Sequence, residues 1–191
     1  MRLDSLQWSV YLWDMLSVEV TAKVGGLFAL LTLLHFVADW VFQSHAEAMA
    51  KTRDSLVRAK HCLIYTAILT VAIWAALAPS RGVLAVTAFT LWFSHLIEDT
   101  YLPVYVWGKY IRKPLELQEG QDPLLGFQAF ASTALGKILL ITLDQLVHLI
   151  FLLPICVMLV CPQTFYLASS VAFFGVAGLV AVAYVGKKDL G

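Results

Sequence analysis

Long apolar runs restrict the fold of this chain more than any other feature. Apolar residues make up 60% of its 191 residues and charged residues only 14%, whereas a soluble domain is about half apolar and about a quarter charged. Each run approaches the roughly 20 residues that a helix needs to cross the hydrocarbon layer, and lipid cannot satisfy the polar backbone of an open sheet. The sequence therefore predicts an all-α integral membrane protein, a bundle of about five transmembrane helices.

The apolar runs divide the chain into three parts. Residues 1–23 form an N-terminal segment, for which an interfacial helix is one interpretation, and residues 187–191 form a C-terminal tail. Between them, residues 24–186 are expected to fold as a single transmembrane helical domain. The expected spans are residues 24–42, 61–78, 82–99 (with an optional extension to 107), 139–160 and 165–185.

Basic residues lie almost entirely on one side of these spans. Five spans place ten of the 13 basic residues in the loops after spans one and three and in the C-terminal tail, and three on the opposite side. By the positive-inside rule the richer side is cytoplasmic, so we expect the N-terminus outside and the C-terminus inside. The formal net charge of zero indicates no nucleic-acid partner, and the expected partner is the lipid bilayer.

Three of the predicted spans contain a histidine and an aspartate four residues apart. This spacing places two side chains on one face of a helix, about one turn apart, so that one helix can offer two ligands to one ion. Ionisable residues inside a membrane are costly and are functional candidates by default. The three pairs are His35 with Asp39, His95 with Asp99, and Asp144 with His148.

The order of the residues in each pair follows the direction of its span. Spans one and three run inward and read His then Asp, while span four runs outward and reads Asp then His. In all three spans the aspartate then lies nearer the cytoplasm and the histidine about 6 Å deeper. We therefore expect two layers of side chains near the cytoplasmic face. The expected metal ligands are His35, His95 and His148 over Asp39, Asp99 and Asp144, together with His61 at the start of span two.

These buried aspartates need compensation, because each one disfavours insertion by about 2.5–3.5 kcal/mol at the centre of a helix. A divalent cation supplies it, and a mixed set of imidazoles and carboxylates favours zinc first, then iron or manganese. Two alternatives stay open. In the first, some aspartates orient a ligating histidine instead of binding the ion. In the second, the histidines and aspartates form a metal-free hydrogen-bonded network that relays protons.

Other polar residues near the pairs are candidates for catalysis or substrate binding. Gln43 continues the helix face of His35 and Asp39 by one more turn. Lys109 and Arg112 belong to an aromatic and basic cluster, which indicates either an interface anchor or a cradle for a lipid phosphate. The candidate catalytic residues are Asp39, Glu98, Asp99 and Asp144, and the candidate substrate-binding residues are Gln43, Lys109 and Arg112.

The HxxxD, HxxxD and DQxxH motifs resemble those of an uncharacterised family of small bacterial and phage multi-span membrane proteins, classed as a domain of unknown function. The resemblance covers most of residues 30–150, and we accordingly expect a multi-pass protein of the bacterial cytoplasmic membrane. It supports treating the motif residues as one set and lends no activity or substrate. The stretches that carry it are residues 35–43, His61, residues 95–99 and residues 143–148.

The pattern favours a membrane-embedded metal-binding protein, and within that class a metal-dependent hydrolase that acts on a lipid or lipid-linked substrate from the cytoplasmic leaflet. Bound zinc generates hydroxide at neutral pH and polarises a scissile group. The alternatives are a proton or ion transporter, and a non-catalytic membrane protein with a structural metal or a His–Asp network. The sequence has no pair of spans broken by Gly or Pro at corresponding positions, which weighs against the transporter.

Overall fold

The computed structural model describes residues 17–51, 53–100, 104 and 132–161, and within them the chain forms helices and no strand. The all-α prediction is confirmed, and the expected count of about five helices fits. Four of the five expected spans are described helices, while the fifth, residues 165–185, lies outside the described residues. The elements are α2 (Val18–Phe36), the π-helical turn η1 (Val37–Val41), α3 (His45–Ala50), α4 (Ser55–Leu77), α5 (Arg81–Glu98) and α8 (Ala134–Val160).

Three of the helices begin earlier than the apolar runs indicated. The starts of α2, α4 and α8 precede the predicted starts by five or six residues. The physical reason is capping, because a side-chain oxygen that accepts from the first backbone N–H groups sets the start of a helix. The capping residues are Ser17 for α2, Ser44 for α3, Asp54 for α4, Ser80 for α5 and Thr133 for α8.

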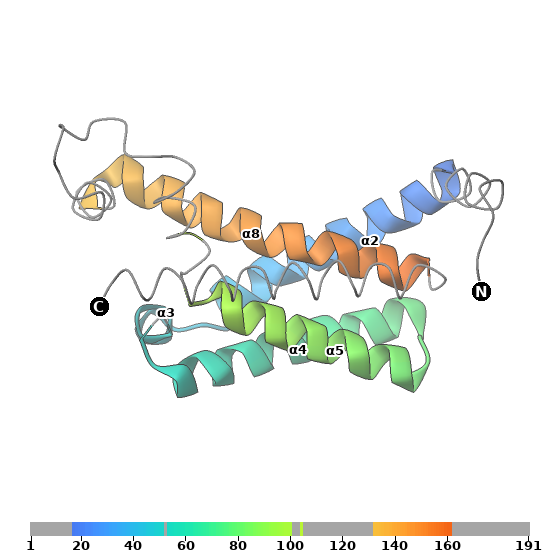
Figure 1. The fold of residues 1–191 in the computed structure, drawn as a ribbon, viewed down its shortest axis with the longest axis horizontal. Coiled ribbons are helices and arrows are strands. Elements are labelled where there is room, and N and C mark those ends of the chain that lie inside the picture. The colour runs from blue at the N-terminus through green and yellow to red at the C-terminus, as the bar shows by residue number, and fades with distance from the viewer. Residues whose placement is uncertain (1–16, 52, 101–103, 105–131, 162–191) are drawn as a thin grey trace, which may run out of the picture.

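The four long helices form a closed ring, with α4 packed against α2 and α5, and α8 packed against the same two helices. Consecutive long helices run in opposite directions, as Figure 1 shows. The start of α4 therefore lies near the end of α2, and the end of α5 lies at the same end of the bundle. This topology brings the polar ends of the predicted spans together, as the residue order had indicated.

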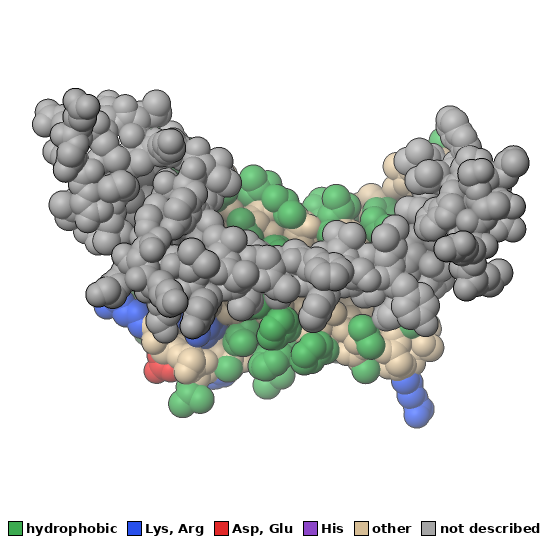
Figure 2. All heavy atoms as spheres, viewed as in Figure 1, with side chains coloured by type: hydrophobic (Ala, Val, Ile, Leu, Met, Phe, Trp, Pro, Cys, Tyr) green, Lys and Arg blue, Asp and Glu red, His purple; other side chains and the backbone are tan. Residues whose placement is uncertain are grey.

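Three of these helices are long and apolar enough to cross a membrane: residues 18–41, α4 and α8. Large apolar side chains also cover the outside of the described bundle, where Figure 2 shows them as broad hydrophobic areas. Leu33, Phe89 and Ile138 are each more than 60% exposed, which is costly in water and favourable in lipid. The chain is therefore described as a multi-pass membrane protein.

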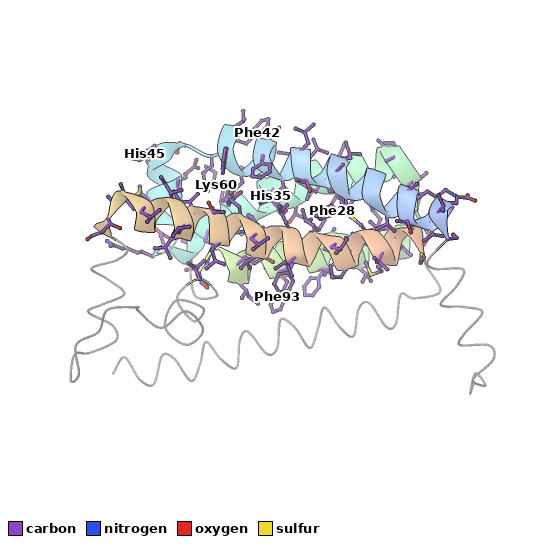
Figure 3. All side chains as sticks on the ribbon, turned by 90° about the horizontal axis from the view of Figure 1, so that it is seen from above. Phe28, His35, Phe42, His45, Lys60 and Phe93 are labelled. Atoms are coloured by element: carbon purple, nitrogen blue, oxygen red, sulfur yellow. The ribbon has the colours of Figure 1, made fainter. Side chains whose placement is uncertain are left out.

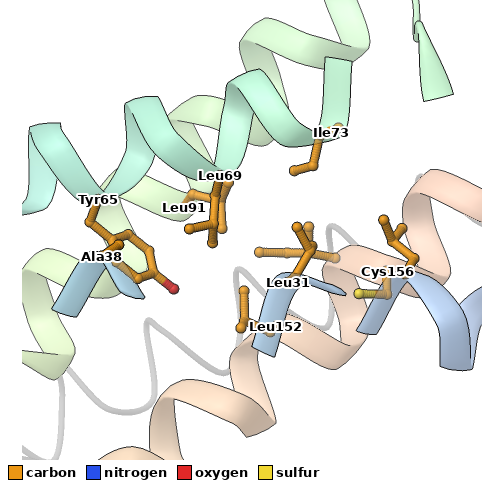
Figure 4. Packing of buried hydrophobic residues seen from close by; sticks show 10 residues of the cluster. Leu31, Ala38, Tyr65, Leu69, Ile73, Leu91, Leu152 and Cys156 are labelled. Carbon is orange, nitrogen blue, oxygen red and sulfur yellow. The ribbon is translucent and has the colours of Figure 1, made fainter. Parts of the chain in front are cut away.

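The interior of the bundle has an apolar half and a polar half. The apolar half, shown in Figure 4, is formed by side chains such as Leu31, Leu69, Ile73, Leu91 and Leu152, each at most 2% exposed. Along every helix these residues lie on the side of the histidines that faces away from the aspartates. The polar half lies at the opposite end and contains the candidate site.

The end of α2 departs from α-helical geometry where the first His–Asp pair occurs. Residues 37–41 form the π-helical turn η1, which contains Asp39 and the fully buried Ala38. Single π turns inside α-helices occur frequently at functional sites. Here the turn leaves Asp39 only 4% exposed, on the inner side of the bundle together with His35.

Candidate metal centre

Two groups of buried side chains at the polar end of the bundle have the composition of a metal site. In each group, one ligand atom from every member lies within 4.8 Å of the others. The first group comes from η1, α4 and the end of α5, and the second from α5 and α8. The first group is Asp39, His61, His95 and Asp99, and the second group is His95, Glu98 and His148.

The first group has the spacing of a tetrahedral site. Nε2 of His61 lies 3.0 Å from Oδ1 of Asp39, 3.1 Å from Nε2 of His95 and 3.5 Å from Oδ2 of Asp99. Nε2 of His95 lies 3.5 Å from that same Asp99 oxygen. A tetrahedral zinc ion with bonds of about 2.0–2.1 Å holds its ligand atoms about 3.3 Å apart. Four of the six separations among these two nitrogens and two oxygens are thus close to the value that a four-coordinate ion requires.

The second group is looser and contains one carboxylate. Oε2 of Glu98 lies 3.4 Å from Nε2 of His148 and 3.8 Å from Nδ1 of His95. All three side chains are at most 3% exposed. Glu98 and Asp99 both reach the centre because residues three and four positions after His95 flank it on the same helix face.

Tyr65 and Asp144 fix the orientation of two of the histidine rings. The Tyr65 ring stacks flat on His95, with centroids 3.7 Å apart and planes 4° apart. Nδ1 of His148 lies 2.8 Å from the backbone oxygen of Asp144, and a backbone carbonyl can only accept. His148 therefore donates from Nδ1, the arrangement that leaves Nε2 of a neutral imidazole free to bind an ion, as in many ligating histidines.

Lys51 places an ammonium group beside the first group. Its Nζ donates to Oδ1 of Asp39 at 3.1 Å and lies 2.8 Å from Oδ1 of Asp99. Burial alone would lower the pKa of this ammonium, but the carboxylates of Asp99 and Asp39 outweigh burial and raise it. Arg58 holds the segment in place, because its Nη1 donates to the backbone oxygen of Lys51 at 2.9 Å.

Negative charge exceeds positive charge around these groups. The buried Asp39, Glu98 and Asp99 and the half-buried Asp144 face a single buried ammonium, that of Lys51, among the described residues. When all four carboxylates are ionised and the histidines beside them are neutral, the negative charges exceed the positive charge by three. Uncompensated charges in a poorly solvated interior are costly, so the centre has the electrostatics of a cation site.

The structure does not group the ligands in the expected layers of three histidines over three aspartates. His35 lies between the helices (Figure 3), but its Nδ1 lies 3.2 Å from the Tyr65 hydroxyl and its Nε2 2.9 Å from Oε1 of Gln145. Both ring nitrogens are thus engaged by protein atoms. Asp144 lies outside both groups and accepts from Nε2 of Gln145 at 3.3 Å.

Two of the three residues suggested for substrate binding, Lys109 and Arg112, lie outside the described residues. Gln43 follows η1, is half-buried, and its Nε2 is buried without a hydrogen-bond partner in the described part of the chain. His45 belongs to neither ligand group and is exposed at the start of α3.

Three residues of the polar network carried a weak signal or none in the sequence. Tyr65 follows His61 by four residues, so the spacing rule applied to the aspartates would have found it. Gln145 directly follows Asp144 in the third motif, and its Nε2 donates to Oδ2 of Asp39 at 3.2 Å, which joins α8 to η1. Lys51 had no signal, because a lysine in a loop after a span is first of all a topology marker.

Comparison with known proteins gives a family for the chain. A model of proteins of unknown function, DUF3307, matches residues 27–174, a range that includes every member of both ligand groups. The chain belongs to the DUF3307 family. The predicted resemblance to an uncharacterised family is thereby confirmed, and the DUF3307 match carries no activity with it. No curated protein and no solved structure shows significant similarity to the chain.

Proposed function

We propose that this protein binds a divalent transition metal at the cytoplasmic end of its bundle and uses it as a membrane-embedded hydrolase. The observation that carries the proposal is the first ligand group, in which Asp39, His61, His95 and Asp99 come together from three elements with four of their six separations between 3.0 and 3.5 Å. Random polar contacts between helices have no reason to bring four ligand atoms this close to one another.

The ligand chemistry favours zinc, with iron or manganese next. Two imidazoles and two carboxylates suit these ions better than calcium, which prefers oxygen ligands alone, or copper(I), which prefers sulfur. Cys62 is the nearest thiol, and its Sγ donates weakly to Oδ2 of Asp99 at 3.9 Å. It therefore supports a ligating carboxylate and does not belong to either group.

The surroundings of the centre fit an anionic lipid or lipid-linked substrate. When bound, the ion would supply an activated water and polarise the scissile group. The ammonium of Lys51 and the half-buried guanidinium of Arg58, whose Nε makes no hydrogen bond within the described residues, are donors of the kind that recognise a phosphate headgroup. We infer that they orient such a headgroup from the inner leaflet.

The apolar half of the bundle argues against the alternative, a proton or ion transporter. A conduit needs polar groups along its whole length. In the described residues the space beyond the His35 side chain is packed by Leu31, Leu69, Ile73 and Leu152, so the histidines and carboxylates end halfway through the bundle and only hydroxyls such as that of Thr87 are buried beyond them. A non-catalytic protein with a structural metal is the remaining alternative, and metal-dependent turnover separates it from a hydrolase.

We predict that purified protein contains zinc and that His61→Ala or Asp39→Asn removes the ion of the first group, since each variant leaves only three of its four ligands. Elemental analysis by mass spectrometry measures the metal per chain, and His45→Ala is the matched control with an exposed histidine. Zinc-loaded protein should then hydrolyse some member of a panel of lipid phosphoesters and esters, and chelator should stop it. Turnover that survives complete metal removal would contradict the proposal.

We also predict a cytoplasmic C-terminus and an external N-terminus, because ten of the 13 basic residues lie on one side of five spans. A cytoplasmic reporter fused after Gly191 should be active and a periplasmic reporter inactive. The same reporters after Ala78, in the connection between α4 and α5, should give the opposite result. Activity of the periplasmic reporter after Gly191 would place the metal centre on the external side and overturn the choice of inner-leaflet substrate.

A further inference from the structure

Three buried ligand atoms next to the first group have no hydrogen-bond partner among the described residues. They are Nδ1 of His95, Oε1 of Glu98 and Nε2 of His148, each with almost no accessible surface. A buried polar atom left without a partner costs about 1–3 kcal/mol, and native structures contain only a few of them. Here three such atoms belong to the three members of the second ligand group, so one ion held by this group would give the two histidine nitrogens a partner and lie beside the Glu98 carboxylate.

The chemistry of these atoms suits a cation. His148 donates from Nδ1 to the backbone oxygen of Asp144, which leaves its Nε2 available to offer a lone pair to an ion. Glu98 presents a carboxylate, and the two side chains approach to 3.4 Å without making a hydrogen bond. Acceptors that converge in a buried space repel one another unless a positive charge lies between them.

His95 faces both groups with opposite sides of one ring. Its Nε2 lies 3.1 Å from Nε2 of His61 in the first group, while its Nδ1 points toward Oε2 of Glu98, 3.8 Å away. The flat stack on Tyr65 holds the plane of the ring, so that both nitrogens are aimed at once. One imidazole can thus bind two ions, one on each side.

Charge also allows a second ion. A divalent ion in the first group and the ammonium of Lys51 together balance three of the four negative charges of Asp39, Glu98, Asp99 and Asp144. One negative charge is still uncompensated, and Glu98, which forms no ion pair with Lys51 among the described residues, belongs to the second group.

We propose that His95, Glu98 and His148 bind a second divalent cation, so that the protein holds a two-ion centre bridged by the imidazole of His95. This inference rests on the proposed function, because the first group supplies the other ion. A neutral imidazole has one lone pair and one N–H, so the first ion would use the lone pair of Nε2, and the proton on Nδ1 would leave to solvent as the second ion binds. With three protein ligands the second ion would keep an open position for the water that the proposed hydrolysis needs, the arrangement of catalytic zinc sites.

The test is the metal content of the full chain in detergent, stripped with chelator and reloaded with Zn²⁺ alone. Wild-type protein should hold two ions per chain, and Glu98→Gln, which keeps the size of the side chain, should hold one. His61→Ala should also hold one ion, the one bound by the second group. His45→Ala should hold two. When wild-type apoprotein is titrated with Co²⁺, the visible absorbance should rise until two equivalents have been added and then level off. This measurement does not depend on the folding of any variant.

The outcomes separate this inference from the proposal on which it rests. One ion in both wild type and Glu98→Gln would overturn the second site and leave the first intact. Two ions in Glu98→Gln would show that the second ion binds elsewhere, which would overturn the site proposed for it. Folded wild-type protein that takes up no zinc and no cobalt would overturn the proposed metal function itself, and the two-ion centre with it.

Discussion

Replacement of His95 by alanine is expected to abolish the binding of both ions, a larger effect than any other single ligand substitution. His95 is the only residue that belongs to both ligand groups, so its loss leaves three ligands in one group and two in the other. Loss even of a residue that merely orients a ligand lowers metal affinity about 10- to 100-fold, and loss of a shared ligand should exceed this for both ions. Zinc per chain should fall from two to near zero.

The control for this experiment is His95→Phe, which keeps a flat ring to stack on Tyr65 and removes both nitrogens. It should lose the ions as His95→Ala does, while retaining more of the thermal stability of the apoprotein. Adding His61→Ala to either variant should then cost little further affinity, because residues that act as one unit are not additive. Retention of one tightly bound ion by His95→Phe would show that the ring is not shared.

Replacement of Lys51 by methionine is expected to destabilise the metal-free protein by about 3–5 kcal/mol, the usual cost of removing one partner from a buried ion pair. Asp39 and Asp99 both lose their contact with the ammonium, at 3.1 Å and 2.8 Å. The same change should tighten zinc binding at least about tenfold, because an ammonium beside the site repels an incoming cation. Zinc should therefore restore most of the stability that the substitution removes.

Thermal unfolding in detergent, with and without Zn²⁺, measures both effects. The matched control is Lys60→Met, because Lys60 pairs with Glu47 at 2.8 Å on an exposed surface, where its side chain is 66% exposed. Exposed pairs contribute little to stability, so this variant should melt close to wild type under both conditions. If Lys51→Met melts like Lys60→Met without metal, the ammonium is not the counter-ion of the two aspartates.

The part of the site that the sequence predicts is the part governed by helix periodicity. The four-residue spacing and the direction of each helix place the side chains of His95 and Asp99 at one end of the bundle. In the structure they lie there, together with His61 and Asp39. These rules depend only on the rise and twist of a helix, which every α-helix shares.

The sequence does not predict the rotation of each helix about its own axis. His35 and His95 have the same spacing to an aspartate, yet His35 contacts Tyr65 and Gln145 while His95 lies in both ligand groups. That choice depends on how the four helices pack, which no single helix encodes. Lys51 is unpredictable for a related reason, because only the path of the loop through α3 returns it to Asp39.

A π turn contains one residue more than the α turn that it replaces, so η1 acts as a single-residue insertion absorbed within α2. Each added residue rotates everything after it by about 100°. Leu27 and Leu31, which contact the apolar core, lie before the insertion. Asp39 lies within it, so the direction of its carboxylate is set independently of the direction of those two side chains. Excising one residue from Val37–Val41 would leave every ligand present in the chain and still turn the carboxylate away from its partners.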